Sequence, residues 1–349
     1  MNLPLGSLPE RIENEEALEE LLSRPTPGVL EFVRSLEGDC LILGVGGKMG
    51  PTLARQLKRA LVQMEKPNRV IGVSRFGEPG LRSQLEEWGI ETLAADLLEP
   101  GSLQSLPDAE NVFYLAVRKF GSTGDEEYTW AMNVFLPGLV AERYSRSRIV
   151  SLSTGNVYPL IPVHWGGSLE SDPVAPVGEY AQSCVGRERM FQYFSKKMGT
   201  PVALMRLNYA VELRYGILLD LAQKVYAGTP IPLAMGNVNV IWQGDANACI
   251  IQALGLCASP PRMINLTGPE ILSIRRLAET FSRQFERTPR FDGMESETAL
   301  LSHAGQAFGL FGYPAVALER LIHWVAHWVQ IGGPTLNKPT HYEEREGKF

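Results

Sequence analysis

A short run of glycines, Gly44, Gly47 and Gly50, is the feature that most constrains how this chain can fold. The run follows an apolar segment at 40–43 and precedes a helical pattern that begins near Pro51. A buried strand, a tight glycine turn and a helix N-terminus together present backbone N–H groups and the positive end of a helix dipole to an anion. In this setting the glycine spacing predicts a turn that binds the pyrophosphate of a dinucleotide.

After this turn, strand-like and helix-like segments alternate, which is typical of a parallel sheet covered by helices on both faces. The expected strands are 40–43, 70–74, 91–95, 112–117, 149–153 and 202–207, and the expected helices are 53–64, 81–88, 126–144 and 179–197. The fold class is therefore α/β, with a Rossmann-type doubly wound parallel sheet and a smaller C-terminal substrate-binding lobe. The expected parts are an N-terminal helical extension (1–38), a dinucleotide-binding domain (39–209, with 238–268 returning to it), a lobe (210–237 and 269–331) and a polar tail (332–349).

Composition excludes several function classes. The chain has 349 residues, of which 44% are hydrophobic, and this is enough for one large core with an attached lobe. No apolar stretch is long enough to span a bilayer, and the acidic N-terminus does not resemble a secretory signal, so we expect a cytoplasmic protein without a membrane partner. The net charge of -6 argues against nucleic acid as the main partner. The four cysteines are scattered without CxxC spacing, so neither a disulfide framework nor a metal site is expected.

Residues that follow the strands are candidate ligand contacts, because such sheets bind ligands at the carboxyl ends of their strands. Ser74 and Arg75 follow the second strand, where a hydroxyl and a guanidinium suit a ribose 2′-phosphate, so NADP is favoured over NAD, with a solvated loop charge as the alternative for Arg75. Asp96 follows the third strand and either accepts from the adenine amino group or caps a helix. The expected cofactor residues are Gly44, Gly46, Gly47, Lys48, Met49, Ser74, Arg75, Asp96, Leu97, Leu115, Ala116 and Tyr180.

A hydroxyl side chain at a strand end is the catalytic candidate that the strand pattern itself indicates. Thr154 stands at the end of the fifth strand, where it either hydrogen-bonds a substrate oxygen or caps the strand, and Tyr180 opens the helix that follows. Charged residues after the fourth strand either meet an anionic group or are solvated. The candidate substrate residues are Arg118, Asn156, Asn208 and Arg214, and Tyr215, Trp242 and Gln243 serve either the substrate or the packing of the lobe.

These motifs, in this order, make residues 40–330 resemble an extended short-chain dehydrogenase/reductase of the NAD(P)-dependent epimerase/dehydratase family. The matching landmarks are the three glycines, Asp96-Leu97, Asn133, Ser153-Thr154, Val157-Tyr158, Arg206-Leu207-Asn208, Asp245 and Asn265-Leu266-Thr267-Gly268. The resemblance implies an oxidoreductase or epimerase that acts on a sugar or nucleotide sugar, with Tyr180 as acid/base and Thr154 orienting the reacting oxygen. It also implies a homodimer that pairs through the helices expected at 126–144 and 179–197.

The sequence departs from the family where the pattern YxxxK reads Tyr180 to Cys184. In the family, that lysine holds the nicotinamide ribose and lowers the pKa of the tyrosine. Arg187 lies one turn further along the helix, and Lys48, Arg118 or Lys119 can approach through the fold. A catalytically silent NAD(P)-binding sensor or partner protein is the alternative function, and non-redox chemistry such as dehydration is a third.

The C-terminal part is expected to contain helices at 215–226, 245–256 and 273–285 and short strands at 238–242 and 263–266. A strongly amphipathic helix at 316–329 carries Trp324 and Trp328, which are predicted to lie in the core or in a subunit contact. The tail either wraps the surface or is disordered. The extension before residue 38 is predicted to hold two short helices that pack on the rest of the chain or on a second copy.

Overall fold

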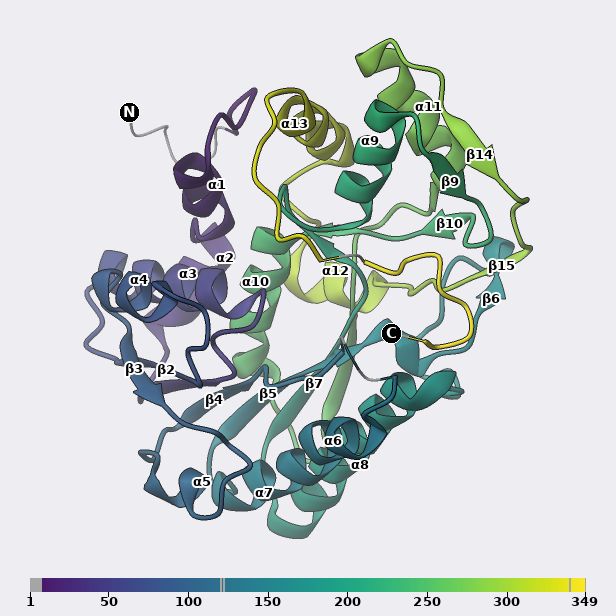
Figure 1. Cartoon of the computed structure of the whole chain (residues 1–349). Helices are drawn as coiled ribbons and strands as arrows, with labels where there is room; N and C mark the ends of the chain where they lie inside the picture. Colours follow the sequence, from purple (N-terminus) through teal and green to yellow (C-terminus); the bar gives the residue numbers. More distant parts are fainter. Residues whose placement is uncertain (1–7, 120, 122, 339, 349) are drawn as a thin grey trace.

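Seven parallel strands form the centre of the molecule, in the order β12-β7-β5-β4-β1-β2-β3. The computed structural model describes residues 8–119, 121, 123–338 and 340–348. The strands are β1 (Cys40–Leu43), β2 (Val70–Ser74), β3 (Glu91–Ala94), β4 (Asn111–Tyr114), β5 (Arg148–Thr154), β7 (Val202–Leu207) and β12 (Arg262–Leu266). Since β1 pairs with both β2 and β4, the strand order reverses at β1, where such sheets bind ligands. The predicted doubly wound α/β fold is confirmed (Figure 1).

Both faces of this sheet are buried, which explains the continuous apolar runs of its central strands. In β1, Cys40 and Ile42 pack with helices α2 (Pro27–Arg34), α3 (Gly50–Gln63) and α10 (Gln243–Gln252). Leu41 and Leu43 point to the opposite face, against α7 (Leu136–Arg143) and α8 (Gly178–Met198). Helices α4 (Leu81–Glu87) and α5 (Ser102–Ser105) also lie beside the sheet.

The helix expected at 126–144 is interrupted. It consists of α6 (Glu126–Trp130), a π-helical segment η1 (Ala131–Phe135) and α7. Such bulges appear mostly as single turns inside α-helices, frequently at functional sites. Asn133 lies in this segment and is completely buried.

A second core lies beyond the carboxyl ends of the strands (Figure 1). Its helices are α9 (Ile217–Ala227), α11 (Ile274–Phe285) and α13 (Leu318–Gln330). Trp324 and Trp328 are fully buried there, so the prediction that they belong to the core is confirmed. Smaller elements that the sequence pattern did not predict are β6 (Ile161–Pro162), β8 (Ala210–Val211), β9 (Pro230–Pro232), α12 (Gly305–Phe311), β14 (Arg290–Asp292) and β15 (Thr298–Ala299).

The prediction of one continuous strand over 238–242 is wrong. Two separate strands occupy it, β10 (Asn237–Val238), paired with β13 (Leu272–Ser273), and β11 (Ile241–Trp242), paired with β8. Between them the buried Asn239 donates to the carbonyl of Glu270 and accepts from the N–H of Ser302, which ends the first pairing. Within 238–268, β12 is therefore the strand that joins the large sheet.

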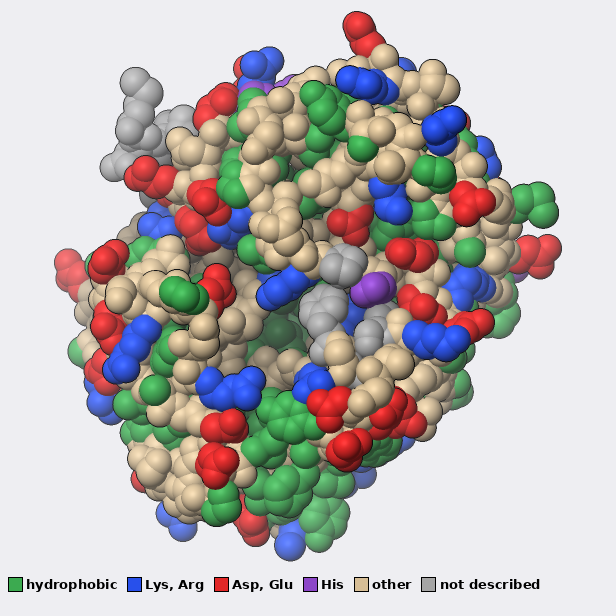
Figure 2. All heavy atoms as spheres, in the orientation of Figure 1, with side chains coloured by type: hydrophobic (Ala, Val, Ile, Leu, Met, Phe, Trp, Pro, Cys, Tyr) green, Lys and Arg blue, Asp and Glu red, His purple; other side chains and the backbone are tan. Residues whose placement is uncertain are grey.

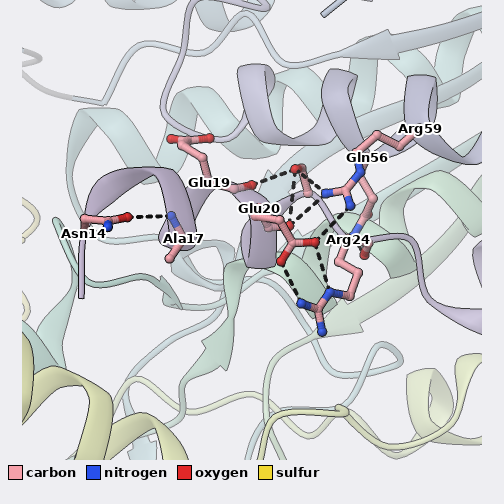
Figure 3. Close-up of polar contacts among 8 residues, drawn as sticks. Asn14, Ala17, Glu19, Glu20, Arg24, Gln56 and Arg59 are labelled. Carbon is pink, nitrogen blue, oxygen red and sulfur yellow. Dashed lines mark hydrogen bonds and ion pairs between the residues drawn. The ribbon is translucent and has the colours of Figure 1, made fainter. Parts of the chain in front are cut away.

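The N-terminal extension packs against α3. In α1 (Glu15–Leu22), Asn14 caps the helix by accepting from the N–H of Ala17 at 2.9 Å. The carboxylate of Glu20 pairs with Arg59 of α3 at 2.9 Å, and Gln56 of α3 donates to the carbonyl of Arg24 (Figure 3). Residues 1–7 of the extension lie outside the described part of the chain.

The tail lies along the second core. The N–H of Leu336 donates to the carbonyl of Arg214, and Thr340 donates to the carboxylate of Asp220. Further along, Arg345 donates to the carbonyl of Thr298. The interpretation that the tail wraps the surface is confirmed for its described residues, whereas residues 339 and 349 lie outside them.

The four cysteines are free thiols. Across the residues that the structure describes, no group of three His, Cys, Asp or Glu side chains is arranged to hold a metal ion. Nor does any helix in this part of the chain combine the length and the apolar character that crossing a membrane requires.

Candidate functional site

A cavity of about 360 Å³ opens at the carboxyl ends of β1, β4, β5 and β7. Figure 2 shows this hollow near the centre of the molecular face, with Lys and Arg side chains around its margin. The glycine turn forms one wall, and residues from β5 and α8 form another. Residues 207–211 and 215–217 close the side toward the second core, together with Leu336, Lys338 and Thr340 of the tail.

The glycine turn between β1 and α3 is shaped by two close approaches of backbone. Gly44 has φ +87°, and a Cβ there would lie 2.6 Å from the backbone nitrogen of Ala116. A Cβ on Gly50 would overlap the carbonyl oxygen of Val45. Gly47 is exposed at the turn, and Gly47, Lys48 and Met49 all border the cavity. Because no side chain caps the N-terminus of α3 behind this turn, the residues present fit the diphosphate of a dinucleotide.

The residues after β2 and β3 lie on one side of the turn. A Cβ on Gly46 would meet the hydroxyl of Ser74, and Arg75 extends from the same strand end with its Nη1 3.6 Å from the Oδ2 of Asp96. Arg75 also donates to the hydroxyl of Tyr128 at 3.3 Å. The Oδ1 of Asp96 accepts from the N–H of Leu98 at 3.1 Å within a turn. The next helix, α5, begins at Ser102 with Gly101 as its N-cap, so the alternative that Asp96 caps a helix is wrong. The structure therefore brings Ser74, Arg75 and Asp96 together.

Leu97, Leu115 and Ala116 are buried. Leu115 borders the cavity, and Ala116 supplies the backbone that Gly44 approaches. These three residues form apolar support around the turn and offer no charged group to a ligand.

Tyr180 and Thr154 meet at the opposite wall. The side chain of Tyr180 hydrogen-bonds with those of Thr154 and Cys184, and both Tyr180 and Thr154 border the cavity. Burial raises the pKa of Tyr180 well above 10, and the neighbouring Cys184 acts in the same direction, while Arg187 opposes them. At neutral pH the phenol is therefore protonated and able to donate a proton.

Arg187 lies next to this pair and also borders the cavity. It is buried, and its Nη1 donates to the carbonyl of Leu152 at 2.9 Å while its Nη2 lies 3.6 Å from the sulfur of Cys184. Burial raises the pKa of the Cys184 thiol, although the guanidinium partly offsets this. Position 184 therefore holds a neutral thiol at neutral pH, and the positive charge comes from elsewhere.

Two half-buried lysines face the same cavity. Lys48 donates to the carbonyl of Ala210 at 2.7 Å, and its Nζ lies 4.5 Å from the centroid of the Tyr215 ring. Lys119 follows β4 and interacts electrostatically with Cys184. Burial lowers the pKa of each ammonium to about 8. Both are cationic near pH 7, so the cavity favours an anionic ligand.

The four candidate substrate residues have different positions. Asn156 and Asn208 border the cavity. Arg118 pairs with Asp125 at 2.6 Å. Neither Arg118 nor Arg214 is among the described residues that border the cavity. That these two arginines contact the substrate therefore stays a prediction, and the cavity gives it no support.

The reason for the misplacement of Arg214 is a long-range contact. Its guanidinium is 2.7 Å from Glu19 of α1, 3.0 Å from Glu212 and 3.3 Å from Glu15. These carboxylates come from the N-terminal extension and from the neighbouring strand end. They use the charge of Arg214 to attach α1 to the second core.

Of the three residues with two open interpretations, one borders the cavity, one packs the lobe and one joins α10 to α3. Tyr215 borders the cavity. Trp242 is buried with its ring edge-on to Trp324, and Gln243 donates to the hydroxyl of Thr52 at 3.0 Å. Sequence reasoning missed the tail residues Leu336, Lys338 and Thr340, which also border the cavity. No local pattern in the polar tail indicates this contact.

Several of the family landmarks form a buried polar network, and one of them, Ser153, also borders the cavity. Glu188 of α8 pairs with Arg206 of β7 through two contacts, at 2.7 and 2.9 Å, and accepts from Ser153 at 2.6 Å. Arg206 also donates to the hydroxyl of Tyr158, which donates to Asn265 of β12 at 2.8 Å. The network ties α8, β5, β7 and β12 together behind the catalytic candidates.

Comparison with known proteins agrees with this geometry. Residues 40–212 match the model of the NAD dependent epimerase/dehydratase family. No curated protein sequence matches the chain. Among solved structures, a UDP-glucuronic acid 4-epimerase from Bacillus cereus is similar with a TM-score of 0.70 and 16% identity, over 84% of this chain and 99% of that one.

Two further structures have the same fold. A UDP-glucose 4-epimerase from Thermotoga maritima has a TM-score of 0.67 and 14% identity, over 84% of this chain and 98% of its own. A dTDP-glucose 4,6-dehydratase from Bacillus anthracis, in complex with NAD, has a TM-score of 0.69 and 14% identity, over 84% of this chain and 96% of its own.

Proposed function

The chain belongs to the NAD dependent epimerase/dehydratase family, and from this premise we propose that it is an NAD(P)-dependent oxidoreductase that epimerises or dehydrates a sugar or nucleotide sugar. One observation carries the proposal. The hydrogen-bonded pair Thr154 and Tyr180 faces the glycine turn across a single cavity. A cofactor held at the turn and a sugar held beside the pair would meet in that space.

The roles of the residues follow from their positions. Gly44, Gly46, Gly47, Lys48 and Met49 would hold the diphosphate. When bound, the nicotinamide accepts and returns a hydride. Thr154 would orient the reacting oxygen of the sugar, and Tyr180 would exchange a proton with it. Asn156 and Asn208, which border the cavity, would bind the sugar.

Nucleotide sugars are the first substrates to test, because the similar proteins include structures in complex with UDP-glucuronic acid and UDP-glucose. The purified protein is incubated with UDP-glucose, UDP-glucuronic acid or dTDP-glucose and with each cofactor, and the products are resolved by chromatography. We expect an epimer or a 4-keto product from at least one substrate. Cofactor binding without any product would support the alternative, a catalytically silent binding protein, which the neutral thiol at Cys184 favours.

We further propose that NADP is preferred to NAD, since Arg75 follows β2 and its guanidinium suits a ribose 2′-phosphate. Arg75→Ala should weaken NADPH binding about tenfold and leave NADH binding unchanged, because the guanidinium supplies a charge-assisted hydrogen bond to a phosphate. Isothermal titration with both cofactors measures the two affinities. Arg34→Ala, which removes an exposed arginine paired with Glu31, is the matched control. An equal loss for both cofactors would contradict the preference.

A homodimer is the proposed assembly. Trp130 and Phe135 of the segment α6-η1 and Tyr193 of α8 are large apolar side chains that are exposed. Figure 2 shows hydrophobic side chains gathered where Figure 1 places these helices. Light scattering should give twice the chain mass of 38.6 kDa, and Phe135→Glu should halve the measured mass by placing a charge in the contact. A wild-type protein that stays monomeric at micromolar concentration would rule the contact out.

A further inference from the structure

The sequence left four cations as candidates to act beside Tyr180, and the structure separates them. Arg118 is neutralised by Asp125 at 2.6 Å and also donates to the carbonyl of Gly121. Lys48 is held by the carbonyl of Ala210 and the ring of Tyr215, on the side of the cavity toward the second core. Neither is directed to the wall that Tyr180 and Thr154 form.

Arg187 is close to Tyr180 but fixed. It is fully buried, and its two terminal nitrogens are committed to the carbonyl of Leu152 and the sulfur of Cys184. It borders the cavity beside Tyr180, but these two contacts hold its guanidinium in place. A ligand in the cavity would meet a guanidinium that already has these partners.

Lys119 is the last of the four candidates that the sequence left open. It borders the same cavity as Thr154 and Tyr180 and is half-buried. It is also near enough to Cys184, one helical turn after Tyr180, for a thiolate there to raise the pKa of its ammonium. The side chain comes from the loop after β4, so it reaches this wall from outside α8. The ammonium of Lys119, on a flexible four-carbon side chain, can adjust to a ligand, whereas the guanidinium of Arg187 is held by its partners.

The backbone that carries Lys119 is attached to α8. The side chain of Asn133 accepts from the N–H of Arg118 at 3.0 Å and donates to its carbonyl at 2.8 Å. The same amide nitrogen donates to the hydroxyl of Ser183 at 2.9 Å, and that hydroxyl donates to the carbonyl of Tyr180. One buried asparagine therefore fixes the residue before Lys119 relative to the turn of α8 that holds Tyr180 and Cys184.

We propose that Lys119 supplies, from the loop after β4, the positive charge that binds the nicotinamide end of the cofactor beside Tyr180, in place of a lysine at position 184. The inference rests on the proposed function for the identity of the ligand. In this chain the positive charge then comes from Lys119 in the loop after β4, and position 184 of α8 carries a neutral thiol. Asn133 is then a positioning residue that acts through the loop.

The test moves the positive charge from position 119 to position 184 and measures cofactor binding. NADH and NADPH affinities are measured by fluorescence titration for wild type, Lys119→Met, Lys119→Arg and the double variant Lys119→Met with Cys184→Lys. Lys196→Met, which removes an exposed lysine near the end of α8, is the control for loss of one positive charge. Circular dichroism verifies the fold of each variant.

We expect Lys119→Met to weaken binding of the preferred cofactor about tenfold or more, because a charge-assisted hydrogen bond is lost. Lys119→Arg should stay within about threefold of wild type, and the double variant should recover most of the lost affinity, since the two positions share one ligand group. Lys196→Met should bind as wild type does.

Three results overturn the inference. They are unchanged affinity in Lys119→Met, an equal loss in Lys119→Arg, and a folded double variant that recovers nothing. If the double variant does not fold, the comparison of Lys119→Met with Lys119→Arg decides. These measurements need no turnover, so a wild type that binds cofactor but converts no sugar would end the proposed function while the role of Lys119 is still decided.

Discussion

Replacing Tyr180 by phenylalanine should lower kcat by about 10²- to 10⁴-fold, which is the range for loss of a general acid/base, and should leave cofactor affinity nearly unchanged. The change removes the hydroxyl that bonds with Thr154 and leaves the buried ring in place. The measurement is steady-state turnover of the best nucleotide sugar found for the wild type, together with cofactor titration. Turnover above a tenth of wild type would exclude Tyr180 as the proton donor.

Thr154 offers a matched pair of controls for the same chemistry. Thr154→Val keeps the shape of the side chain and removes the hydroxyl that bonds with Tyr180, so it should also reduce turnover. Thr154→Ser retains a hydroxyl at that position and should recover most of the rate. If valine and serine have equal effects, the packing of Thr154 matters and its hydrogen bond does not.

The surroundings of Tyr180 also bear on the direction of the reaction. Burial holds the pKa of the phenol well above 10, so it is protonated across the neutral range and ready to donate to a carbonyl oxygen. Accepting a proton from a sugar hydroxyl requires the phenolate, which nearby positive charge favours. Arg187 supplies such a charge next to the phenol, and Lys119 would supply another from the loop after β4. The reduction of a keto group is therefore the easier half of the proposed cycle.

The sequence predicted the central sheet because its central strands are buried on both faces. β1, β2 and β7 have the bounds that their continuous apolar runs indicate, and the glycine turn follows β1 as expected. The same pattern failed at 238–242, where an apolar run turns at the buried Asn239 and splits between two pairings. Periodicity detects burial, and it does not detect which partner a short strand finds.

The site was predictable where neighbouring strand ends fix it and unpredictable where distant segments meet. Thr154 and Tyr180 lie together because α8 packs against the strand β5. Arg214 was misplaced because its partners Glu15 and Glu19 lie about two hundred residues earlier in the chain. The tail reaches the cavity by the same kind of long-range contact, which no local spacing encodes.

The buried pair of Glu188 and Arg206 should have the largest effect on stability. Arg206→Met should reduce the free energy of unfolding by about 3–5 kcal/mol, because it leaves the carboxylate of Glu188 buried without its partner. Both side chains are at most 4% exposed, and Arg206 makes two contacts with the carboxylate. Tyr158 would also lose the N–H that its hydroxyl accepts. Urea unfolding followed by fluorescence measures the change.

The double variant Glu188→Met with Arg206→Met separates an unpaired charge from lost packing. Removing both charges leaves apolar side chains of similar length in the same space, and such replacements of buried pairs are often neutral or stabilising. The double variant should therefore be more stable than Arg206→Met alone. Arg189→Met, which changes an exposed arginine on the same helix, should shift the free energy by no more than about 0.5 kcal/mol. If the double variant is as unstable as the single one, packing around Arg206, and not the charge of Glu188, accounts for the loss.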